Sequence, residues 1–438
     1  MMRQLVDHTR AFLCIGILAA ISLSARSGST ITLEESMALA RRSLPSFQAS
    51  EQQVQSTEAL YTASLSPYLP FLDATTRQER IYSSPEDFTL STYDVVLSYI
   101  LFDGGKRRAN RNIAQLNLNI DQQEHRKNLI DLLFDVKSAF YIAVARHEIV
   151  QQREIQLQDA ERDHEVAQGR NRLGAAKLSD VLQAGVRLEQ AKFNLVQGRG
   201  ELKNSLSDFN SLLGRPLGTP YDLEGSLDFA VPLPTISALS TVALQRPEIK
   251  QAESQVKISK NTKSLETSTF FPTITANASY SKAESSIAEF RGISSEDKAV
   301  GLNATWNIFD LGKFYRRKSA SFAISASRER LDESRRQLLL DLEKTYQDLL
   351  TAAQNVKVSE EQLVEAEHNY AQAFGEYKVG KGDILSLVTA QSLLSNAREQ
   401  LISSRLNHVL AKALLERVAG IESLSSLKPQ TLDTMNGS

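Results

Sequence analysis

The chain has 438 residues, a formal net charge of −2 and a single cysteine. A nearly balanced charge excludes the strong positive field that draws nucleic acids to a protein surface, so no nucleic-acid partner is expected. One cysteine excludes an internal disulfide and a cysteine-rich metal site. The low proline and glycine content, beside abundant leucine, alanine, glutamine and glutamate, is typical of long helices.

Residues 1–25 have the features of a secretory signal peptide. Arg3 and Arg10 accompany an apolar run at residues 11–23, and Ala25 is a suitable last residue before cleavage. The alternative, a membrane anchor, is disfavoured because a spanning helix needs about 20 apolar residues. Cys14 lies inside the run and follows the large Leu13, so lipidation is not expected. We therefore predict an exported chain without cysteine.

The remaining sequence divides into two similar halves, residues 26–216 and 217–420, and a tail, residues 421–438, that is expected to be flexible. Several landmarks recur in the same order and at nearly constant spacing, which predicts a tandem repeat. The landmark pairs are Pro70 with Pro272, Asp103 with Asp310, Gly105 with Gly312, Gly174 with Gly380, and Gly214 with Gly420.

Each half predicts a helix, two strands, a long helix, a turn and a returning helix. Apolar residues at steps of three and four, such as Leu129, Leu132 and Val136, have the spacing of a coiled coil. Taken alone, the helices fit an elongated soluble coiled coil. The predicted ranges are strands 71–82 and 90–102 with helices 103–172 and 178–213, then strands 272–282 and 298–309 with helices 311–376 and 384–418.

The predicted strands alternate between apolar and small polar residues. Ile274, Ala276, Ala278 and Tyr280 are separated by threonine, asparagine and serine, and residues 300–309 alternate in the same way. About ten such residues can cross a membrane as a tilted strand, although half-buried hairpins of a soluble sheet would also alternate. Four strands cannot close a barrel, which needs about eight, and open edges cannot face lipid. Membrane strands would therefore require an oligomer, either a dimer or a trimer.

In this order and repetition, several motifs resemble the TolC-like outer-membrane efflux protein family from Thr30 to about Gly420. They are LEESMALA (33–40), LFDGGKRR (101–108), LGAAKLSDVLQA (173–184), RPEI (246–249), IFDLGK (308–313) and VGKGDILSLVTA (379–390). The resemblance implies a mainly α fold with a transmembrane β part. It also implies a homotrimer, in which a 12-stranded outer-membrane barrel is continued by a periplasmic α-helical barrel.

The resemblance further implies partners and a cargo route. A periplasmic adaptor and an inner-membrane pump or ABC exporter would dock to the trimer in a tripartite efflux or type I secretion system. Outer-membrane lipid would surround the barrel, and no cofactor is expected. The exported substrate, be it a drug, a metal ion or a polypeptide, is left open.

In the family, the two helix–helix turns form the periplasmic tip and gate, which places Gly174 and Gly380 there. This sequence departs from the family in three positions: Ser386 and Thr389 stand where many members have aspartates, and Gly382 replaces an arginine seen in some. The charges near the turns are instead Lys177, Asp180, Lys381 and Asp383. Our hypothesis is that attraction between these charges, repeated around a ring, favours the closed state, although each exposed pair contributes only about 0–1 kcal/mol.

Joint residues are expected where strands meet helices. Asp103 and Asp310 are suitable helix N-caps, Gly105 and Gly312 would ease the bend into the helix, and Pro70 and Pro272 precede strands. Cations at a helix N-terminus are disfavoured by the helix dipole, so the basic residues there need another partner. Our hypothesis is that this partner is the anionic headgroups of the periplasmic leaflet; the alternative is simple solvation beside an acidic neighbour. The basic residues are Lys106, Arg107, Arg108, Lys313, Arg316 and Arg317.

An enzyme is not expected, because no nucleophile, base and orienting group recur at a suitable spacing. No histidine has the spacing of a zinc site, and neither a Gly-x-Ser-x-Gly motif nor a phosphate loop is present. The sequence thus predicts no catalytic residue and no metal site. Two interpretations remain: an outer-membrane duct, or a periplasmic coiled-coil structural or adaptor protein without a pore.

Overall fold

The computed structural model describes residues 30–82, 84, 87–228, 234–286 and 294–424. The predicted signal peptide and residues 425–438 of the predicted tail lie outside the described residues. The described residues form two compact units: those within residues 1–40, 136–228 and 362–406 form one, and those within residues 41–135, 229–361 and 407–438 form the other. The long helices α3 (Lys106–Arg172) and α7 (Leu311–Lys378) contribute to both units.

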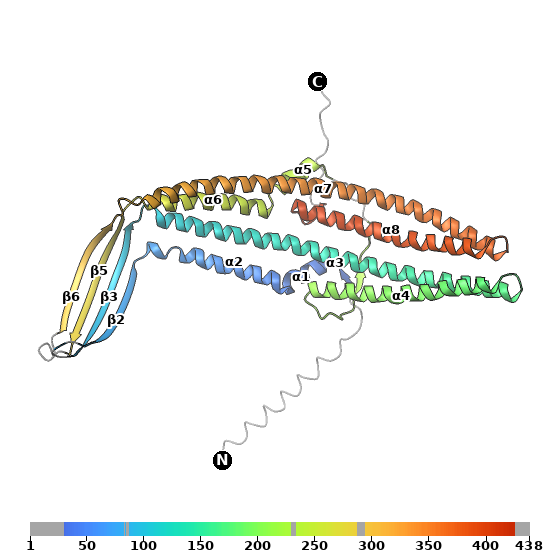
Figure 1. Cartoon of the computed structure of the whole chain (residues 1–438), viewed down its shortest axis with the longest axis horizontal. Helices are drawn as coiled ribbons and strands as arrows, with labels where there is room; N and C mark the ends of the chain where they lie inside the picture. The colour runs from blue at the N-terminus through green and yellow to red at the C-terminus, as the bar shows by residue number, and fades with distance from the viewer. Residues whose placement is uncertain (1–29, 83, 85–86, 229–233, 287–293, 425–438) are drawn as a thin grey trace, which may run out of the picture. The chain divides into compact units, whose positions relative to one another are not determined.

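The second unit contains a four-stranded antiparallel sheet in the order β2-β3-β5-β6 (Figure 1). The central strands β3 and β5 come from different halves of the sequence, so the two repeats share one sheet. Within the described residues, β2 and β6 each pair on one side only. The strands are β2 (Phe71–Ile81), β3 (Phe88–Phe102), β5 (Thr273–Ser285) and β6 (Ser294–Thr305).

The last strand differs from its predicted range of 298–309. It begins at Ser294 and ends at Thr305. The residues after Thr305 form hydrogen bonds outside the sheet. The Trp306 indole N–H donates to the carbonyl oxygen of Phe270, just after α6, at 3.1 Å. The carbonyl oxygen of Asn307 accepts from the Lys313 ammonium at 2.5 Å. The alternation in residues 306–309 therefore continues without strand pairing.

Shorter helices precede each hairpin of strands. Both α2 (Pro45–Ala63) and α6 (Pro247–Ser268) begin with proline in the first turn, where a missing N–H costs no helical hydrogen bond. The remaining short elements are α1 (Leu33–Ser43), η1 (Ser66–Tyr68) and α5 (Ile236–Ala243), and a parallel pair formed by β1 (Thr30–Thr32) and β4 (Asp222–Glu224). The sequence did not predict this small parallel sheet.

In the first unit, α3 turns back into α4 (Leu178–Leu212), and α7 turns back into α8 (Ile384–Ala419) (Figure 1). Gly174 and Gly380 have φ angles of 72° and 80°, which glycine adopts without steric cost. Each turn closes with the same two backbone hydrogen bonds, a Schellman motif. The bonds run from Gly174 to Asn171, Ala175 to Arg170, Gly380 to Tyr377 and Lys381 to Glu376.

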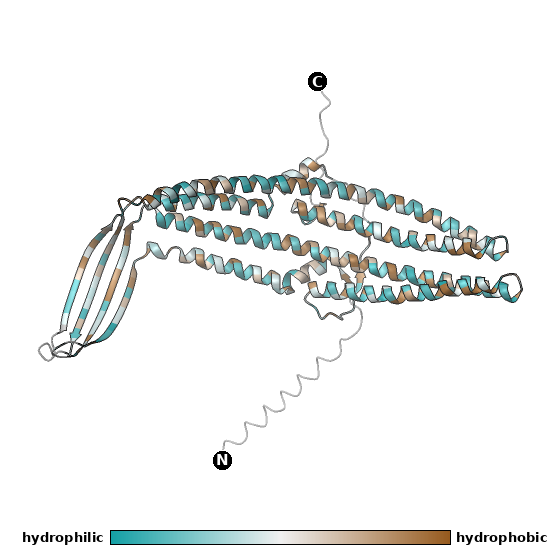
Figure 2. Ribbon diagram, in the orientation of Figure 1, coloured by the Kyte–Doolittle hydropathy of each residue, from teal (hydrophilic) through white to brown (hydrophobic). Residues whose placement is uncertain are grey.

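Apolar packing holds the second helical hairpin together. Tyr377, Leu387, Leu394 and Ala397 are almost fully buried in one cluster between α7 and α8. Figure 2 shows hydrophilic and hydrophobic residues mixed along the long helices. Accordingly, none of the helices in the described part of the chain is long and apolar enough to cross a membrane.

Candidate functional sites: the hairpin tip and the strand–helix joints

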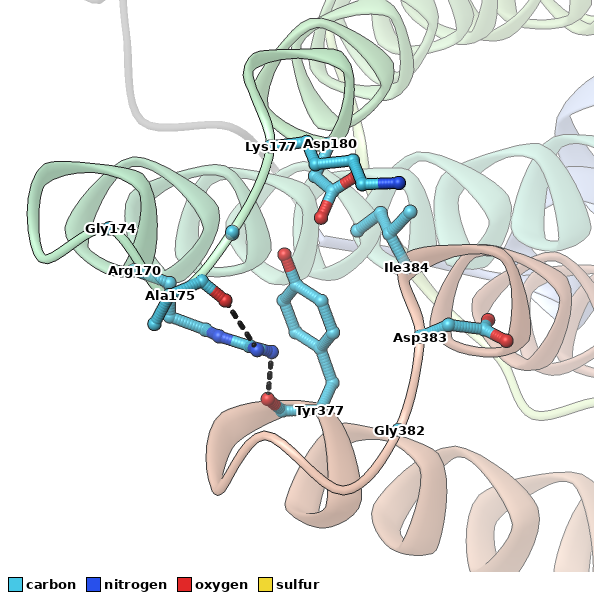
Figure 3. A pocket seen from close by; sticks show the side chains of 10 residues that line it. Arg170, Gly174, Ala175, Lys177, Asp180, Tyr377, Gly382, Asp383 and Ile384 are labelled. Carbon is cyan, nitrogen blue, oxygen red and sulfur yellow. Dashed lines mark hydrogen bonds between the residues drawn. The ribbon is translucent and has the colours of Figure 1, made fainter.

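Arg170, in the last turn of α3, contacts both helix–helix turns (Figure 3). Its guanidinium donates to the carbonyl oxygen of Ala175, at 3.0 Å, and to the carbonyl oxygen of Tyr377 on α7. The same group lies 4.3 Å from the centroid of the Tyr377 ring, a cation–π contact. These residues line an open cavity of about 410 Å³ that also includes Lys177 and Asp383. One cation therefore joins the first helical hairpin to the second.

Among the four predicted tip charges, Asp383 has a defined local role in the described structure. Lys177 is the N-cap residue of α4 without a side-chain cap bond, and Asp180 follows in the first turn. The Asp383 carboxylate accepts from the Ser386 backbone N–H at 2.7 Å and so caps α8. That bond holds the pKa of Asp383 below its usual range. The predicted positions Gly174 and Gly380 form the turns themselves.

None of these four charges forms an ion pair with another residue in the ranges that the structure covers. The charge hypothesis therefore has no support within one chain, and pairing between chains stays a prediction. Ser386 and Thr389 lie on the exposed face of α8. Gly382 is confined instead: a Cβ there would lie 3.1 Å from the backbone nitrogen of Tyr377.

At the first strand–helix joint, Asp103 and Arg107 form a mostly buried pair. The Asp103 carboxylate accepts from the backbone N–H groups of Gly105, at 3.0 Å, and Arg107, at 2.8 Å. The Arg107 guanidinium pairs with Asp103 at 3.1 Å and donates to the carbonyl oxygens of Ile100, at 2.7 Å, and Pro67, at 3.2 Å. The side chains of Arg107 and Asp103 are 15% and 9% exposed. The Asp103 side chain thus caps the first turn of α3, but α3 begins at Lys106 rather than at residue 103, so Asp103 lies two residues before the N-cap position.

The second joint uses the same residue types in a more open arrangement. The Asp310 carboxylate accepts from the Gly312 backbone N–H at 2.8 Å and pairs with Arg316 at 3.0 Å. The hydrogen bond from the Gly312 N–H is the main reason that the pKa of Asp310 lies below its usual value, and the hydrogen bond from Arg316 lowers it further. Arg316 also approaches Glu266 at 3.5 Å, and the Lys313 ammonium donates to the Asn307 carbonyl oxygen.

These contacts correct two predictions. Arg107 and Lys313 bond to the backbone carbonyl oxygens of Ile100 and Asn307 instead of facing headgroups. Lys106, Arg108 and Arg317 are exposed, and their lipid contact stays a prediction. Gly312 does not have a positive φ and lies in the first turn of α7, so it does not ease the bend as Gly105 does. Pro70 and Pro272 directly precede β2 and β5.

A family model described as "Outer membrane efflux protein" matches residues 36–215 and 238–421. The chain belongs to this family. The two matched segments correspond closely to the two halves expected from the sequence. As an outer membrane efflux protein, the chain resides in the outer membrane, and its relatives are channel proteins rather than enzymes.

Two curated relatives of this outer membrane efflux protein illustrate the match. Protein CyaE of Bordetella pertussis is 28% identical over 330 residues, which cover 73% of this chain and 67% of the relative. The toluene efflux pump outer membrane protein TtgC of Pseudomonas putida is 26% identical over 324 residues, covering 68% and 62%. The chain thus spans about two thirds, or slightly less, of the relatives it matches.

Solved structures confirm the fold of this outer membrane efflux protein. The crystal structure of CusC superposes with a TM-score of 0.81 at 16% identity, covering 91% of this chain and 96% of that one. The predicted fold class, mainly α with a β part in two repeats, is therefore confirmed.

The sequence did not identify Arg170, which contacts both helix–helix turns, or its partner Tyr377. The charged residues predicted at the tip all follow a turn glycine, whereas Arg170 lies four residues before Gly174 and Tyr377 lies three before Gly380. A basic residue in the last helical turn, beside free carbonyl oxygens, is the signal that could have indicated Arg170.

Proposed function

We propose that the chain is one subunit of a trimeric outer-membrane duct. The observation that carries the proposal is the amphipathic sheet with two open edges. On one face Leu97 pairs with Ala278, which in turn pairs with Val300, and Val300 and Leu302 are 89% and 74% exposed in the single chain. Such a face suits lipid, and β2 and β6 need partner strands because unpaired backbone groups are not tolerated there.

The opposite face of the sheet supports a water-filled lumen. In the same cross-strand order, Ser98 pairs with Asn277, which pairs with Gly301. Small uncharged residues leave space and can bond to water. Three copies would contribute twelve strands, the number that the family resemblance implies. A periplasmic structural or adaptor protein without a pore, the alternative interpretation, gives the exposed apolar face no role.

We further infer that the helical hairpins form the gate, where a periplasmic adaptor and an inner-membrane pump engage the duct. Polar contacts connect the two hairpins: Arg153 pairs with Glu399 at 3.2 Å and Arg398 with Asp159 at 3.3 Å. Arg170 adds its bond to Tyr377. Polar groups that separate can bond to water, so such a boundary opens at lower cost than an apolar one.

The proposed gate includes the turn positions predicted from the sequence. These are Gly174, Lys177, Asp180, Gly380, Lys381, Asp383, Ser386 and Thr389. The name of TtgC points to export of a small apolar molecule by that relative; for this chain we propose only that the pump selects the cargo.

A matched pair of strand variants tests the duct. Leu302→Asp introduces a charge on the face that pairs with Ala276, whereas Asn303→Asp introduces the same charge on the face that pairs with Thr275. We expect Leu302→Asp to abolish heat-modifiable oligomers in the outer-membrane fraction, because a carboxylate facing lipid is costly. Asn303→Asp should assemble and conduct in planar bilayers. Equal assembly of both variants, or recovery of the parent as a soluble monomer, would contradict the proposal.

A further inference from the structure

A buried carboxylate lies between α3 and α7 in the first unit. Asp163 of α3 is 4% exposed and Tyr370 of α7 is 8% exposed. The Tyr370 hydroxyl donates to both carboxylate oxygens of Asp163, at 3.2 and 3.4 Å. Arg162 in turn donates to the Tyr370 hydroxyl oxygen at 2.7 Å. The tyrosine therefore links the buried acid to a partly exposed guanidinium.

The other charges at this point are engaged elsewhere. On α3, Asp159 pairs with Arg162 at 3.1 Å, and on α8, Arg398 pairs with Asp159 at 3.3 Å. The neighbouring His164 bonds to Gln168 and lies next to Gly185 of α4. Asp163 itself forms no ion pair with another described residue.

Burial without a direct cation makes ionisation of Asp163 costly. Burial raises its pKa to about 6, although the Tyr370 hydrogen bond and the nearby Arg162 act in the opposite direction. Burial is also the main reason that the pKa of Tyr370 is raised, and the negative charges of Asp163 and Asp159 raise it further. The tyrosine hydroxyl therefore keeps its proton and remains a donor.

The direction of the proton linkage follows from this shift. An aspartate released to water returns to a lower pKa, so the packed arrangement holds the proton more tightly than a separated one. Stability that comes from packing Asp163 is fully present at acidic pH and declines as the pH rises through about 6. Acidification thus favours contact between α3 and α7.

We propose that Asp163 acts as a proton-operated latch between α3 and α7: the protonated acid keeps the two helices packed, and its ionisation loosens them. The proposal deepens the proposed function, on which it rests, because these helices belong to the two hairpins of the proposed gate. The signal would be the proton concentration on the side of the membrane that holds the helical hairpins.

Conductance of the full-length protein in planar bilayers tests the latch. For the parent we expect the ratio of open to closed channels to fall about tenfold between about pH 7.5 and about pH 5. Asp163→Asn should remove this dependence and hold the ratio at the parent's acidic value, because the amide is permanently neutral. Glu161→Gln, an exposed acid two residues away on α3, is the matched control and should behave like the parent. Persistent pH dependence in Asp163→Asn would overturn the latch.

A second variant guards against a general loss of structure. Tyr370→Phe keeps the ring but removes the donor that stabilises the ionised carboxylate. Its conductance midpoint should therefore move to higher pH, while a merely structural role for the hydroxyl would leave the midpoint in place.

A distance measurement tests the latch proposal independently of the duct proposal. Spin labels at Glu165→Cys on α3 and Glu367→Cys on α7, both exposed positions, report the distance between the helices when the labelled chain is diluted into unlabelled chain. That distance should increase with pH in the parent and stay constant in Asp163→Asn. If no variant conducts at any pH, the duct proposal fails, and the spin-label distance still decides the latch.

Discussion

The first strand–helix joint and the hairpin tip use similar residues to different ends. At the joint, an aspartate that caps a helix is buried with an arginine, and both bond to backbone groups. At the tip, Asp383 also caps a helix, yet it and the nearby lysines are exposed and form no ion pair among the described residues. The comparison teaches that burial and free carbonyl oxygens, rather than residue type, separate a fixed connection from a turn that can move.

The largest expected effect comes from breaking the buried pair at the joint. Asp103→Ala removes the carboxylate that accepts from two backbone N–H groups, and it leaves the mostly buried Arg107 without its ion-pair partner. Loss of one partner of a buried pair costs about 3 kcal/mol or more. We expect this loss in the free energy of unfolding, measured by chemical denaturation in detergent. Asp310→Ala, at the more exposed joint, is the control and should lose less; equal losses would remove the distinction between the joints.

The next effect concerns the glycines of the first joint. Gly104 has a φ of 64°, and a Cβ there would lie 2.7 Å from the backbone oxygen of Ser268. Gly104→Ala should therefore cost about 2–3 kcal/mol by the same denaturation measurement, from backbone strain and overpacking together. Gly105→Ala meets no neighbouring atom and should show only the strain, about 1–2 kcal/mol. A larger loss at Gly105 than at Gly104 would show that contact with Ser268 is unimportant.

At the tip, a smaller change in stability should give a visible change in gating. Arg170→Gln removes the charged donor to the Ala175 and Tyr377 carbonyl oxygens. A loss of about 1 kcal/mol would raise the ratio of open to closed channels about fivefold in planar bilayers. Lys381→Ala and Asp180→Ala, which remove charges without a described ion pair, should conduct like the parent. Increased opening in these two instead would revive the charge hypothesis between chains.

The smallest effect is expected at the cap of α8. The pKa of Asp383 is held below its usual range by the Ser386 backbone N–H, so the cap stabilises α8 above the usual aspartate pKa and is lost as the pH falls through the lowered value. Asp383→Asn should retain the cap at acidic pH, whereas Asp383→Ala should lack it at every pH. Helical content followed by circular dichroism during acid titration measures this. Identical acid profiles for the parent and Asp383→Ala would show that the cap is unimportant.

The sequence predicted the features that depend on local backbone chemistry. Asp103 caps the first turn of α3, and Gly174 and Gly380 close equivalent turns. Both features depend only on the side chains and φ preferences of a few consecutive residues, which the sequence shows directly. What it missed depends on distant contacts. The need for glycine at position 104 arises from Ser268, and Arg170 matters because Tyr377 lies within reach. The bond from Arg107 to the Ile100 carbonyl oxygen likewise depends on how the end of β3 lies beside the first turn of α3, which the sequence pattern alone does not show.

The pairing of β3 with β5 has a consequence for how the protein folds. Thr89 and Ser286, which are hydrogen bonded at 2.7 Å at one end of this pairing, are 197 residues apart in the sequence. Contacts this distant form slowly. The first hairpin of strands must therefore wait, with one edge of β3 uncovered, until the second repeat has been synthesised. During that interval the edge is a template for aggregation, so we expect a nascent chain truncated before β5 to depend on protection by another protein.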